Sequence, residues 1–551
     1  MLRWAGTLLL LGMMLRPAWC ADQEKLAAPD AAAIAKLIKQ LGSESFAERR
    51  QASQALDDLG AAGLEALEEA AANSKDAETR RQASVLVDKI KGRLAFAYRF
   101  ADKVLQVAEH IHESDVIVVP QSQLVQWAVA GLVDEKTPLS NSLKKRLQAA
   151  DQQDLKKLLR DVRIALAGEN DPGEKDLLRA LEGMVKGLQS VDPYASLFEP
   201  QQFYRDVSWL PEGIGVRIEV DERTKFIRVI GPERGGPAHR AGVQAGDLIT
   251  SVTPFDEKNQ AKPISTKGMA PVDFVRKITG KPGSAVLVSV RRAGKDEEIE
   301  IEIKRDRHRA ATVHPLARKA DDSPEYFIDR ERGIAYLRVE AMRQETFKEF
   351  AEAVKQVKAA GARAVILDLR FNRGGLLATS CQLANALMTE RQGVHLLTRE
   401  EKRPGHKLFA AETGPRAGQI LDLPMVCLVN GETAAGTEWL TAELQDYSRA
   451  AILGARTHGR GAVQNISISH GRALKLSTAL YIRPTGKKID RMAFPGRPAD
   501  EWGVTPDQVV QLTDAETQPV QSYLEHLALV VREERPPDRQ LEAALAYLRK
   551  N

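Results

Sequence analysis

Cysteine is scarce in this sequence, whose 551 residues contain only Cys20, Cys381 and Cys427. The last two alone lie outside a predicted signal segment, and two cysteines do not make the disulfide framework of a small secreted domain. Neither has a histidine or an asparagine at a spacing known for cysteine proteases. We therefore interpret both as buried thiols.

Metal ligands and an excess of one charge are also lacking. The ten histidines are scattered without the spacing of a metal site, so we predict no metal and no cofactor. Lys and Arg number 79 against 75 Asp and Glu, a net charge of +4. This balance, without any nucleic-acid-binding motif, argues against a nucleic-acid partner. Beyond the N-terminal segment, no stretch is apolar enough to span a membrane.

The first 21 residues read as a secretory signal peptide. Arg3 precedes an uncharged apolar run at 4–15, which is too short to cross a bilayer comfortably. Cys20 suggests a lipoprotein, but the bulky Trp19 stands where a lipidation motif needs a small residue. We expect cleavage without lipidation, and export to the periplasm, the cell envelope or the extracellular space.

Residues 30–92 and 93–200 are predicted to be helical. In the first segment apolar residues recur with a period near 3.6, and breaks fall at Gly60, at Gly63 and before Asp76, a good N-cap. The pattern resembles a HEAT-like helical repeat, which would offer a surface for a protein partner. A plain helical hairpin that only covers the core is the alternative.

The period changes at residue 212. Alternating apolar residues at 214–220, 286–290 and 299–303, with glycine-rich turns between them, predict a small β-domain over 212–305. Residues 325–512 then alternate strands with helices, which predicts an α/β core with a mostly parallel sheet. A helical tail, interrupted at Pro536-Pro537, occupies 513–551.

Five motifs in order resemble the C-terminal processing (tail-specific) peptidase family, which carries a PDZ domain. They are D-P-Y-A-S at 192–196, the PDZ-like G-P-A-x-x-A-G-V-x-x-G-D-L-I at 236–249, D-L-R-F-N-R-G-G-L-L at 368–377, Y-I-R-P-T-G at 481–486 and G-V-T-P-D at 503–507. The third departs from the family pattern at Arg373, which replaces proline. The resemblance implies a multidomain α/β fold: a helical HEAT-like region, a PDZ β-domain and a protease-like core.

A PDZ domain binds a peptide C-terminus as an added strand and holds its carboxylate with backbone N–H groups. The resemblance places this carboxylate loop at Gly213, Ile214, Gly215 and Val216. Glycine permits the tight geometry that such a loop needs. The alternative is a closed groove in a domain that serves only as a spacer.

The family's catalytic serine and lysine are not found where the resemblance places them. The serine motif S-A-S-A-S-E corresponds to T-A-A-G-T-E at 433–438, so Ala435 holds the nucleophile position. The lysine motif F-G-K-G-x-x-Q corresponds to H-G-R-G-A-V-Q at 458–464, so Arg460 holds the base position. No other serine or lysine stands near these positions in the sequence.

Alanine has no nucleophile, and arginine stays protonated near neutral pH. We therefore predict a pseudoprotease that binds peptide or protein C-termini. Backbone N–H groups of Gly375 and Gly436 would still form an oxyanion hole, and Gln464 would still orient its neighbour. Two alternatives remain: an active peptidase using Thr433 or Thr437 with His458 as base, and a non-catalytic scaffold.

Overall fold

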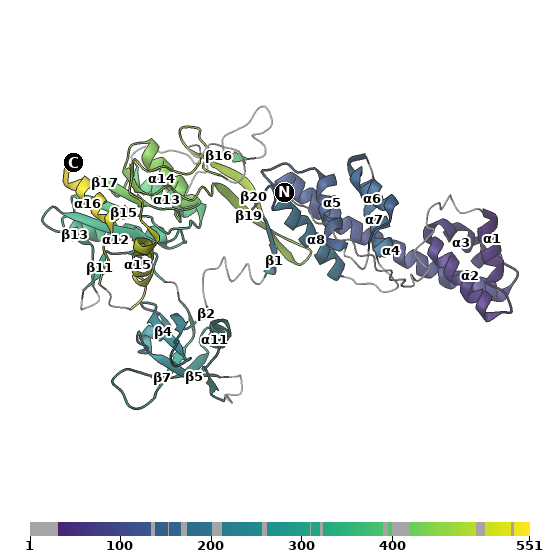
Figure 1. Ribbon diagram of the computed structural model, residues 1–551, viewed down its shortest axis with the longest axis horizontal. Coiled ribbons are helices and arrows are strands. Elements are labelled where there is room, and N and C mark those ends of the chain that lie inside the picture. Colours follow the sequence, from purple (N-terminus) through teal and green to yellow (C-terminus); the bar gives the residue numbers. More distant parts are fainter. Residues whose placement is uncertain are drawn as a thin grey trace, which may run out of the picture. The chain divides into compact units, whose positions relative to one another are not determined.

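The computed structural model describes residues 31–133, 138–152, 154–166, 174–200, 212–255, 262–308, 310–319, 323–388, 395–398, 419–491, 502–530 and 534–550. The chain divides into two compact units, Met1–Leu105 with Leu132–Leu177, and Gln106–Gly131 with Leu178–Asn551. Figure 1 labels the elements of both. The predicted signal peptide and Cys20 lie outside the described residues.

The first unit is helical, as predicted. Its elements are α1 (Ala31–Gln40), α2 (Phe46–Leu59), the 3₁₀ turn η1 (Gly60–Gly63), α3 (Leu64–Asn73), most of α4 (Ala77–Ser114), α6 (Asn141–Gln148), η2 (Ala150–Gln152) and α7 (Leu155–Leu166). Gly60 ends α2 at a φ of 53°. Asp76 begins α4 by accepting the N–H of Thr79 at 2.6 Å. Whether these helices are HEAT repeats stays a prediction.

A boundary expected at residue 92 falls inside α4, which continues without a break to Ser114. Residues 30–92 and 93–200 therefore share a helix rather than meeting at a linker. A sequence of good helix formers gives no stop signal there, because Gly92 is the only helix-weakening residue near that point.

Two further helices, α5 (Gln121–Leu132) and α8 (Glu174–Leu188), cross closely in the second unit. A Cβ atom on Gly131 or Gly183 would overlap the backbone of the other helix, so both positions need glycine. No helix within the described residues has both the length and the apolar composition that crossing a membrane needs.

The predicted PDZ region forms a small antiparallel β-domain. Its elements are β2 (Glu212–Gly213), β3 (Val216–Val220), β4 (Ile227–Pro232), α10 (Pro237–Arg240), β5 (Leu248–Pro254), β6 (Ile264–Ser265), α11 (Pro271–Ile278), β7 (Ala285–Arg291), β8 (Ile299–Lys304) and β9 (Asp306–Arg307). The main sheet has the order β3-β4-β5-β7-β8, which leaves β3 at one edge. Buried valines and isoleucines of these strands pack on Phe274 of α11.

The α/β core contains a mostly parallel mixed sheet, as predicted. Its strands are β10 (Val313–His314), β13 (Phe327–Asp329), β14 (Ile334–Val339), β15 (Ala364–Asp368), β17 (Met425–Val429), β18 (Ala451–Gly454) and β21 (Gln508–Val509). Strands β14, β15, β17, β18 and β21 run parallel to one another, whereas β10 and β13 pair antiparallel with β14. Every residue of β14, β15 and β17 is buried, as expected for strands covered on both faces.

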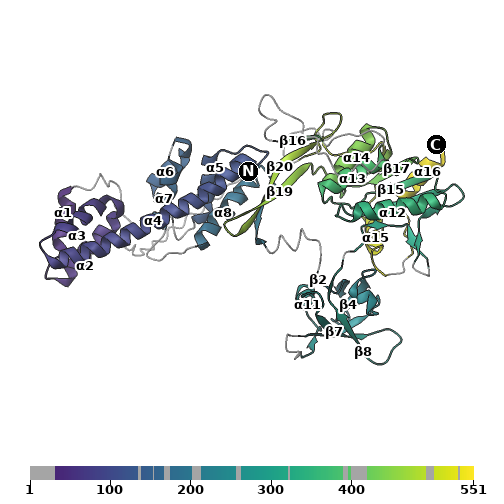
Figure 2. The same ribbon diagram turned by 180° about the vertical axis from the view of Figure 1, so that it is seen from behind.

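Helices cover both faces of this sheet (Figures 1 and 2). One face packs against α12 (Thr346–Ala359), α13 (Leu377–Leu387) and α14 (Gly436–Asp446). The other packs against α16 (Arg539–Lys550), which follows α15 (Asp514–His526). The remaining short strands, β11 (Ala317–Arg318) and β12 (Pro324–Glu325), pair with each other.

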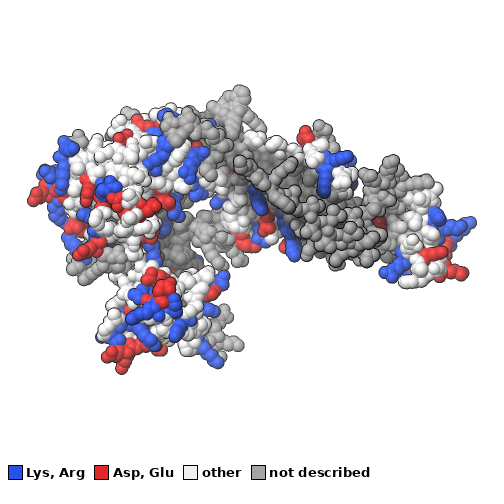
Figure 3. All heavy atoms as spheres, viewed as in Figure 1, with Lys and Arg blue, Asp and Glu red and all other residues white. Residues whose placement is uncertain are grey.

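A second sheet is built on a long hairpin of β19 (Ala462–Ser469) and β20 (Arg472–Ile482). Strands β1 (Ser196–Phe198) and β16 (His395–Thr398) pair with β20. The D-P-Y-A-S motif ends at Ser196, the first residue of β1. Because β1 pairs with β20 and β20 pairs with β19, the motif lies beside the hairpin that follows Arg460. Acidic and basic side chains are interspersed on the described surface that Figure 3 shows.

Candidate functional site

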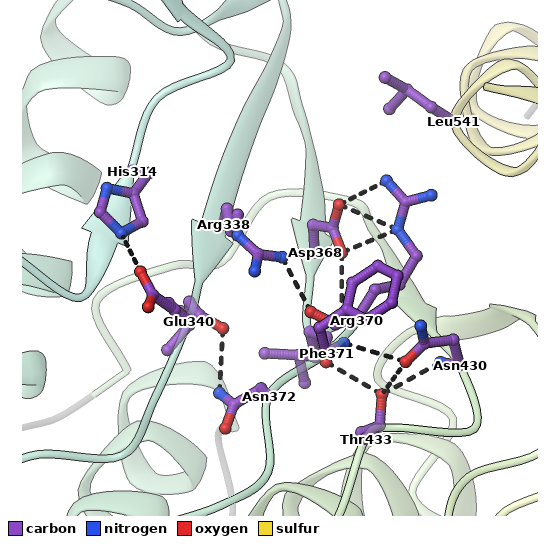
Figure 4. Close-up of polar contacts among 12 residues, drawn as sticks. His314, Arg338, Glu340, Asp368, Arg370, Phe371, Asn372, Asn430, Thr433 and Leu541 are labelled. Carbon is purple, nitrogen blue, oxygen red and sulfur yellow. Dashed lines mark hydrogen bonds and ion pairs between the residues drawn. The ribbon is translucent and has the colours of Figure 1, made fainter. Parts of the chain in front are cut away.

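The candidate site lies where β15 and β17 end. Parallel strands bring their carboxyl ends to one edge of a sheet, where α/β proteins commonly place their sites. The turn after β15, residues 369–376, meets the turn that joins β17 to α14, residues 430–435. Figure 4 shows the polar contacts that hold these turns.

A buried ion cluster anchors the first turn. Asp368 pairs with Arg370 at 2.7 Å, and Arg370 also pairs with Asp538 at 2.8 Å, just before α16. Tyr336 donates its hydroxyl proton to Asp368 at 2.7 Å. Burial raises the pKa of Asp368, but the Arg370 and Arg338 guanidinium groups and the Tyr336 hydroxyl together outweigh burial and hold that pKa below its usual range. The D-L-R motif thus ties the turn to the C-terminal helix.

Asn372 joins the two turns. Its side-chain nitrogen donates to the Val339 carbonyl at 2.9 Å. Its side-chain oxygen accepts from the Gly374 N–H and the Thr437 hydroxyl, both at 2.9 Å. The Ala434 N–H donates to the Asn372 carbonyl at 2.9 Å. This one buried residue fixes the glycine turn against the start of α14.

Gly374 and Gly375 adopt backbone conformations that side chains disfavour, with φ of 95° and 143°. A Cβ atom on Gly375 would overlap the Met342 carbonyl, and one on Gly374 would lie 2.8 Å from the Cβ of Ala435. The position of the Gly374 Cβ is 3.5 Å from the Gly436 nitrogen. Among the described residues, none accepts the N–H of Gly375 or of Gly436. Two free backbone donors therefore lie beside Ala435.

Ala435, the N-cap residue of α14, has a strained backbone conformation, with φ of 56° and ψ of −129°. Its N–H donates to the Glu438 carboxylate at 3.1 Å, which is the half of a capping box that needs no side-chain oxygen on residue 435. A non-glycine residue held at positive φ stores about 1–3 kcal/mol, and such strain clusters at functional sites.

Glu438 connects α14 to the segment that contains Arg460. Its buried carboxylate accepts the Thr457 hydroxyl at 2.5 Å and the N–H groups of Gly459 and Arg460 at 2.6 and 2.8 Å. Burial raises the pKa of Glu438 to about 7, although these donors oppose it. The same oxygen accepts from the nitrogens of both Ala435 and Arg460, so the two positions are close.

Arg460 lies over an aromatic ring and holds a glutamine. Its guanidinium carbon is 5.1 Å from the centre of the Tyr194 ring, and Nη2 donates to Gln464 Oε1 at 2.9 Å. The Tyr194 hydroxyl donates to Asp490 at 3.1 Å, and Asp490 also accepts the Gly461 N–H at 3.0 Å. The D-P-Y-A-S motif therefore positions the Arg460 side chain.

Comparison with known proteins agrees with this architecture. A model of peptidase family S41 matches residues 333–510, and a PDZ domain model matches residues 206–290. The carboxy-terminal-processing protease of Bartonella bacilliformis is 30% identical over 348 residues, 62% of this chain and 71% of that protein. This chain belongs to the C-terminal processing protease family.

Other proteins of this kind match similarly. The carboxyl-terminal-processing protease of a Synechocystis species is 28% identical over 373 residues, 67% of this chain and 76% of the relative. A solved photosystem II D1 C-terminal processing protease is 23% identical, covers 76% of this chain and 99% of its own, and has a TM-score of 0.37.

Thr433 and Thr437, which the sequence offered as alternative nucleophiles, are both fully buried. The Thr433 hydroxyl donates to the Leu369 carbonyl at 3.0 Å, and the Thr437 hydroxyl donates to Asn372. His458 lies 3.2 Å from the Gly431 carbonyl through its ring nitrogen, rather than against either hydroxyl. The two threonines therefore build the turns that hold Ala435.

A serine and a lysine that are remote in the sequence lie near this site. Ser380 of α13 lies against Gly436: its hydroxyl is 2.5 Å from the position of a Gly436 Cβ. Lys475 of β20 is close enough to Arg460 for the two charges to interact. Ser380 and Lys475 come from elements distant in sequence, so spacing around residues 435 and 460 did not reveal them.

The PDZ loop has the features of a carboxylate-binding turn. Gly215 adopts a φ of 67°, and its carbonyl accepts the Glu233 N–H at 3.0 Å. The described residues supply no acceptor for the N–H of Ile214 or Gly215. Val216 then begins β3, the edge strand. Gly213 lies beside the end of α11, because a Cβ atom placed on Gly213 would be 3.6 Å from the Ile278 carbonyl oxygen.

Helix α11 presents apolar side chains beside this edge strand. Val272 and Val275 are 57% and 45% exposed, one turn apart, while Phe274 and Ile278 pack into the domain core. An open strand edge next to exposed valines is the arrangement that accepts an extended apolar peptide.

Both later cysteines are buried thiols, as predicted, and neither forms a disulfide. Burial raises the pKa of Cys427 well above its usual value. Where the chain is described, no three histidine, cysteine, aspartate or glutamate side chains gather as a metal site would require.

Proposed function

We propose that this member of the C-terminal processing protease family binds peptide or protein C-termini and does not cleave them. The residue that begins α14 carries the proposal. Ala435 occupies the position of the family's serine in the sequence motif, beside the two free N–H donors of Gly375 and Gly436. A methyl group in that place cannot attack a peptide carbonyl.

The arginine at the base position supports the same conclusion. A general base must be able to lose its proton near the working pH, and a guanidinium with a pKa above about 12 does not. Arg460 retains the contact with Gln464, so the loop keeps its arrangement while the side chain can no longer accept a proton.

Nearby hydroxyl groups do not supply a replacement nucleophile. Thr433 and Thr437 donate to buried acceptors. Ser380 is fully buried, and its hydroxyl faces the Leu376 carbonyl at 3.5 Å rather than a base. A hydroxyl needs a base within hydrogen-bond reach to become a nucleophile, and among the described residues none of these three hydroxyl groups bonds to one.

A peptidase assay tests this proposal. The wild-type chain and the variants Ser380→Ala, Thr433→Ala and Thr437→Ala are incubated with an unfolded, C-terminally tagged substrate, and products are identified by mass spectrometry. We expect no cleavage by any of them. Cleavage by the wild type that one variant abolishes, while that variant still unfolds at a comparable temperature, would establish a relocated nucleophile.

The PDZ domain is proposed to bind a free, apolar C-terminus. The glycine turn at 213–215, the open edge of β3 and the exposed valines of α11 support it. A peptide acid should bind at least about tenfold more tightly than its C-terminal amide, because the amide loses the charge-assisted hydrogen bonds. Equal affinities would favour the scaffold, with a closed groove and partners bound by the N-terminal helices.

We also propose export of the mature chain, on the strength of the segment at residues 1–21. The N-terminus of the exported protein should begin near Ala21 or Asp22 when measured by mass spectrometry. A diacylglyceryl group on Cys20 would instead establish a lipoprotein.

A further inference from the structure

Arg460 and Lys475 are two cations near each other at this site. Among the described residues, no carboxylate lies within ion-pair distance of either side chain. Lys475 is half-buried, and burial, followed by the charge of Arg460, lowers its pKa. The charge of Asp192 raises the pKa of Lys475, but more weakly than Arg460 lowers it. The oxygens of Asp192 accept from Ser477 and from the Tyr194 N–H. Like charges held together under partial burial are unfavourable unless an anion joins them.

The hairpin places Lys475 beside Gln464. Gln464 pairs with Ser477 across the two strands, and Ile466 pairs with Lys475. Residues two apart on a strand share a face, so Lys475 is the diagonal neighbour of Gln464 on the face that also carries Ser477. The turn before β1 covers the same face through Asp192 and Tyr194.

Gln464 contributes a donor that lacks an acceptor. Its side-chain oxygen accepts from Arg460, whereas its side-chain nitrogen, Nε2, is buried and has no hydrogen-bond partner in the structure. Leaving such a donor unpaired costs about 1–3 kcal/mol. A ligand that supplies an acceptor would remove this cost.

The backbone donors of the glycine turn belong to the same neighbourhood. Glu438 holds the nitrogens of Ala435 and Arg460 on one oxygen. Gly374, the chain neighbour of Gly375, lies against Ala435, and Gly436 follows Ala435 in the chain. Among the described residues, the groups here that could take a further acceptor are donors: the remaining N–H groups of the Arg460 guanidinium, which already donates to Gln464, the Lys475 ammonium, the Gln464 NH₂ and two backbone N–H groups. The ligand must therefore be an acceptor with negative charge.

We propose that Arg460, Lys475 and Gln464, with the N–H groups of Gly375 and Gly436, bind the free carboxylate of a peptide. This site is separate from the PDZ groove, and it deepens the proposed function on which it rests. Arginine suits the role, because its planar fork matches the two oxygens of a carboxylate and a lysine does not. The substitution that removes a general base thus creates a carboxylate receptor.

Calorimetry on the full-length chain tests the site. The PDZ groove is first disabled by Val272→Asp with Val275→Asp, two exposed positions whose change leaves the buried core intact. One apolar peptide is then titrated as its free acid and as its C-terminal amide, at low and at high salt. We expect the acid to bind about tenfold or more tightly than the amide, with salt weakening only the acid.

Variants then assign the binding to this cluster. Arg460→Gln should reduce the affinity for the acid by about tenfold or more, and Lys475→Gln by less, because a single ammonium lacks the fork. Lys487→Gln, an exposed lysine in the turn after β20, is the matched control and should change nothing. NMR of the Lys475 side chain provides a second readout that leaves Arg460 unaltered: its resonance should shift with the acid only.

Two failures are distinguishable. Equal affinity for acid and amide, or full affinity in Arg460→Gln, overturns the carboxylate site and leaves the proposed function standing. Cleaved peptide in the titrated samples, detected by mass spectrometry, overturns the proposed function instead.

Discussion

The turn after β15 and the turn before α14 touch each other, yet their side chains follow the family in different ways. In the first, Asp368, Arg370 and Asn372 match the family motif, and all three are fully engaged with buried partners. In the second, Ala435 has no reactive side chain, and the N–H of the following Gly436 finds no acceptor among the described residues. The comparison teaches that the residues which hold such a site together can lie beside a residue that offers no reactive side chain, so the framework and the chemistry are tested by different substitutions.

The largest effect should come from breaking the framework. Arg370→Ala leaves Asp368 and Asp538 as buried carboxylates without their cation, which should lower the free energy of unfolding by about 3–5 kcal/mol. Urea denaturation measures the loss. Arg373→Ala, on the same turn, is the control: its pair with Glu432 is 74% exposed on the arginine side and should matter by less than about 1 kcal/mol.

A similar loss in both variants would mean that the buried cluster contributes no more than a surface pair. It would also remove the contrast between the two turns.

Restoring the reactive groups tests the other half of the comparison. Ala435→Ser alone should stay inactive, because its hydroxyl has no base and a fixed charge lies nearby. Adding Arg460→Lys should raise peptidase turnover about 10²-fold or more over the single variant, the usual worth of general-base help. Turnover is measured by the same mass-spectrometric assay. Activity in Ala435→Ser without the lysine would show that another group accepts the proton.

The buried carboxylates of α14 predict a pH dependence of stability. Burial raises the pKa of Glu438 to about 7, and burial with the nearby Asp446 raises that of Glu443 to about 8, both from 4.5. Above pH 4.5 the folded chain therefore holds protons that the unfolded chain releases. The free energy of unfolding must fall as pH rises, until about pH 7 for Glu438 and about pH 8 for Glu443.

Each group contributes at most about 1.4 kcal/mol per pH unit. Glu443→Gln removes one of them without changing size, so its stability should fall less steeply between about pH 5 and about pH 8. Urea denaturation across this range compares it with the wild type. Parallel curves would show that Glu443 titrates normally.

The smallest expected effect concerns the strain at the start of α14. Ala435→Gly relieves a positive φ without removing any side-chain contact of importance, and should raise the free energy of unfolding by about 1 kcal/mol. A higher melting temperature of the variant would show that Ala435 holds a strained backbone conformation at the cost of stability. Destabilisation would show that the methyl group itself stabilises the junction with Gly374.

Much of this architecture was predictable from the sequence. The apolar runs at 334–339, 364–368 and 425–429 are uninterrupted, as buried parallel strands require, and glycine pairs mark the turns between elements. Motifs on both sides of Ala435 and Arg460 place these residues at the nucleophile and base positions, and this assignment stays a prediction. Asp76 as a helix cap followed from its side chain alone.

The rest depends on contacts between residues far apart in the chain. Lys475 lies near Arg460 only because the β19–β20 hairpin folds back. The sequence around Lys475 has the pattern of any half-buried strand. Ser380 lies beside Gly436 because two helices pack on one sheet face. The lack of an acceptor for the Gln464 side-chain nitrogen depends on the tertiary structure around it, which no local sequence pattern predicts. The division at residue 92 lies within the continuous helix α4, because the sequence has no stop signal there.

The two buried cysteines give this site a built-in reporter. Cys381 lies on α13 and Cys427 on β17, in the same core cluster that supports the two turns. A buried thiol is inert towards alkylating reagents until the surrounding structure opens. The rate at which each is labelled in the folded protein therefore measures how often α13, which follows the glycine turn, and β17, which precedes the second turn, separate from their neighbours, without any probe having to be introduced.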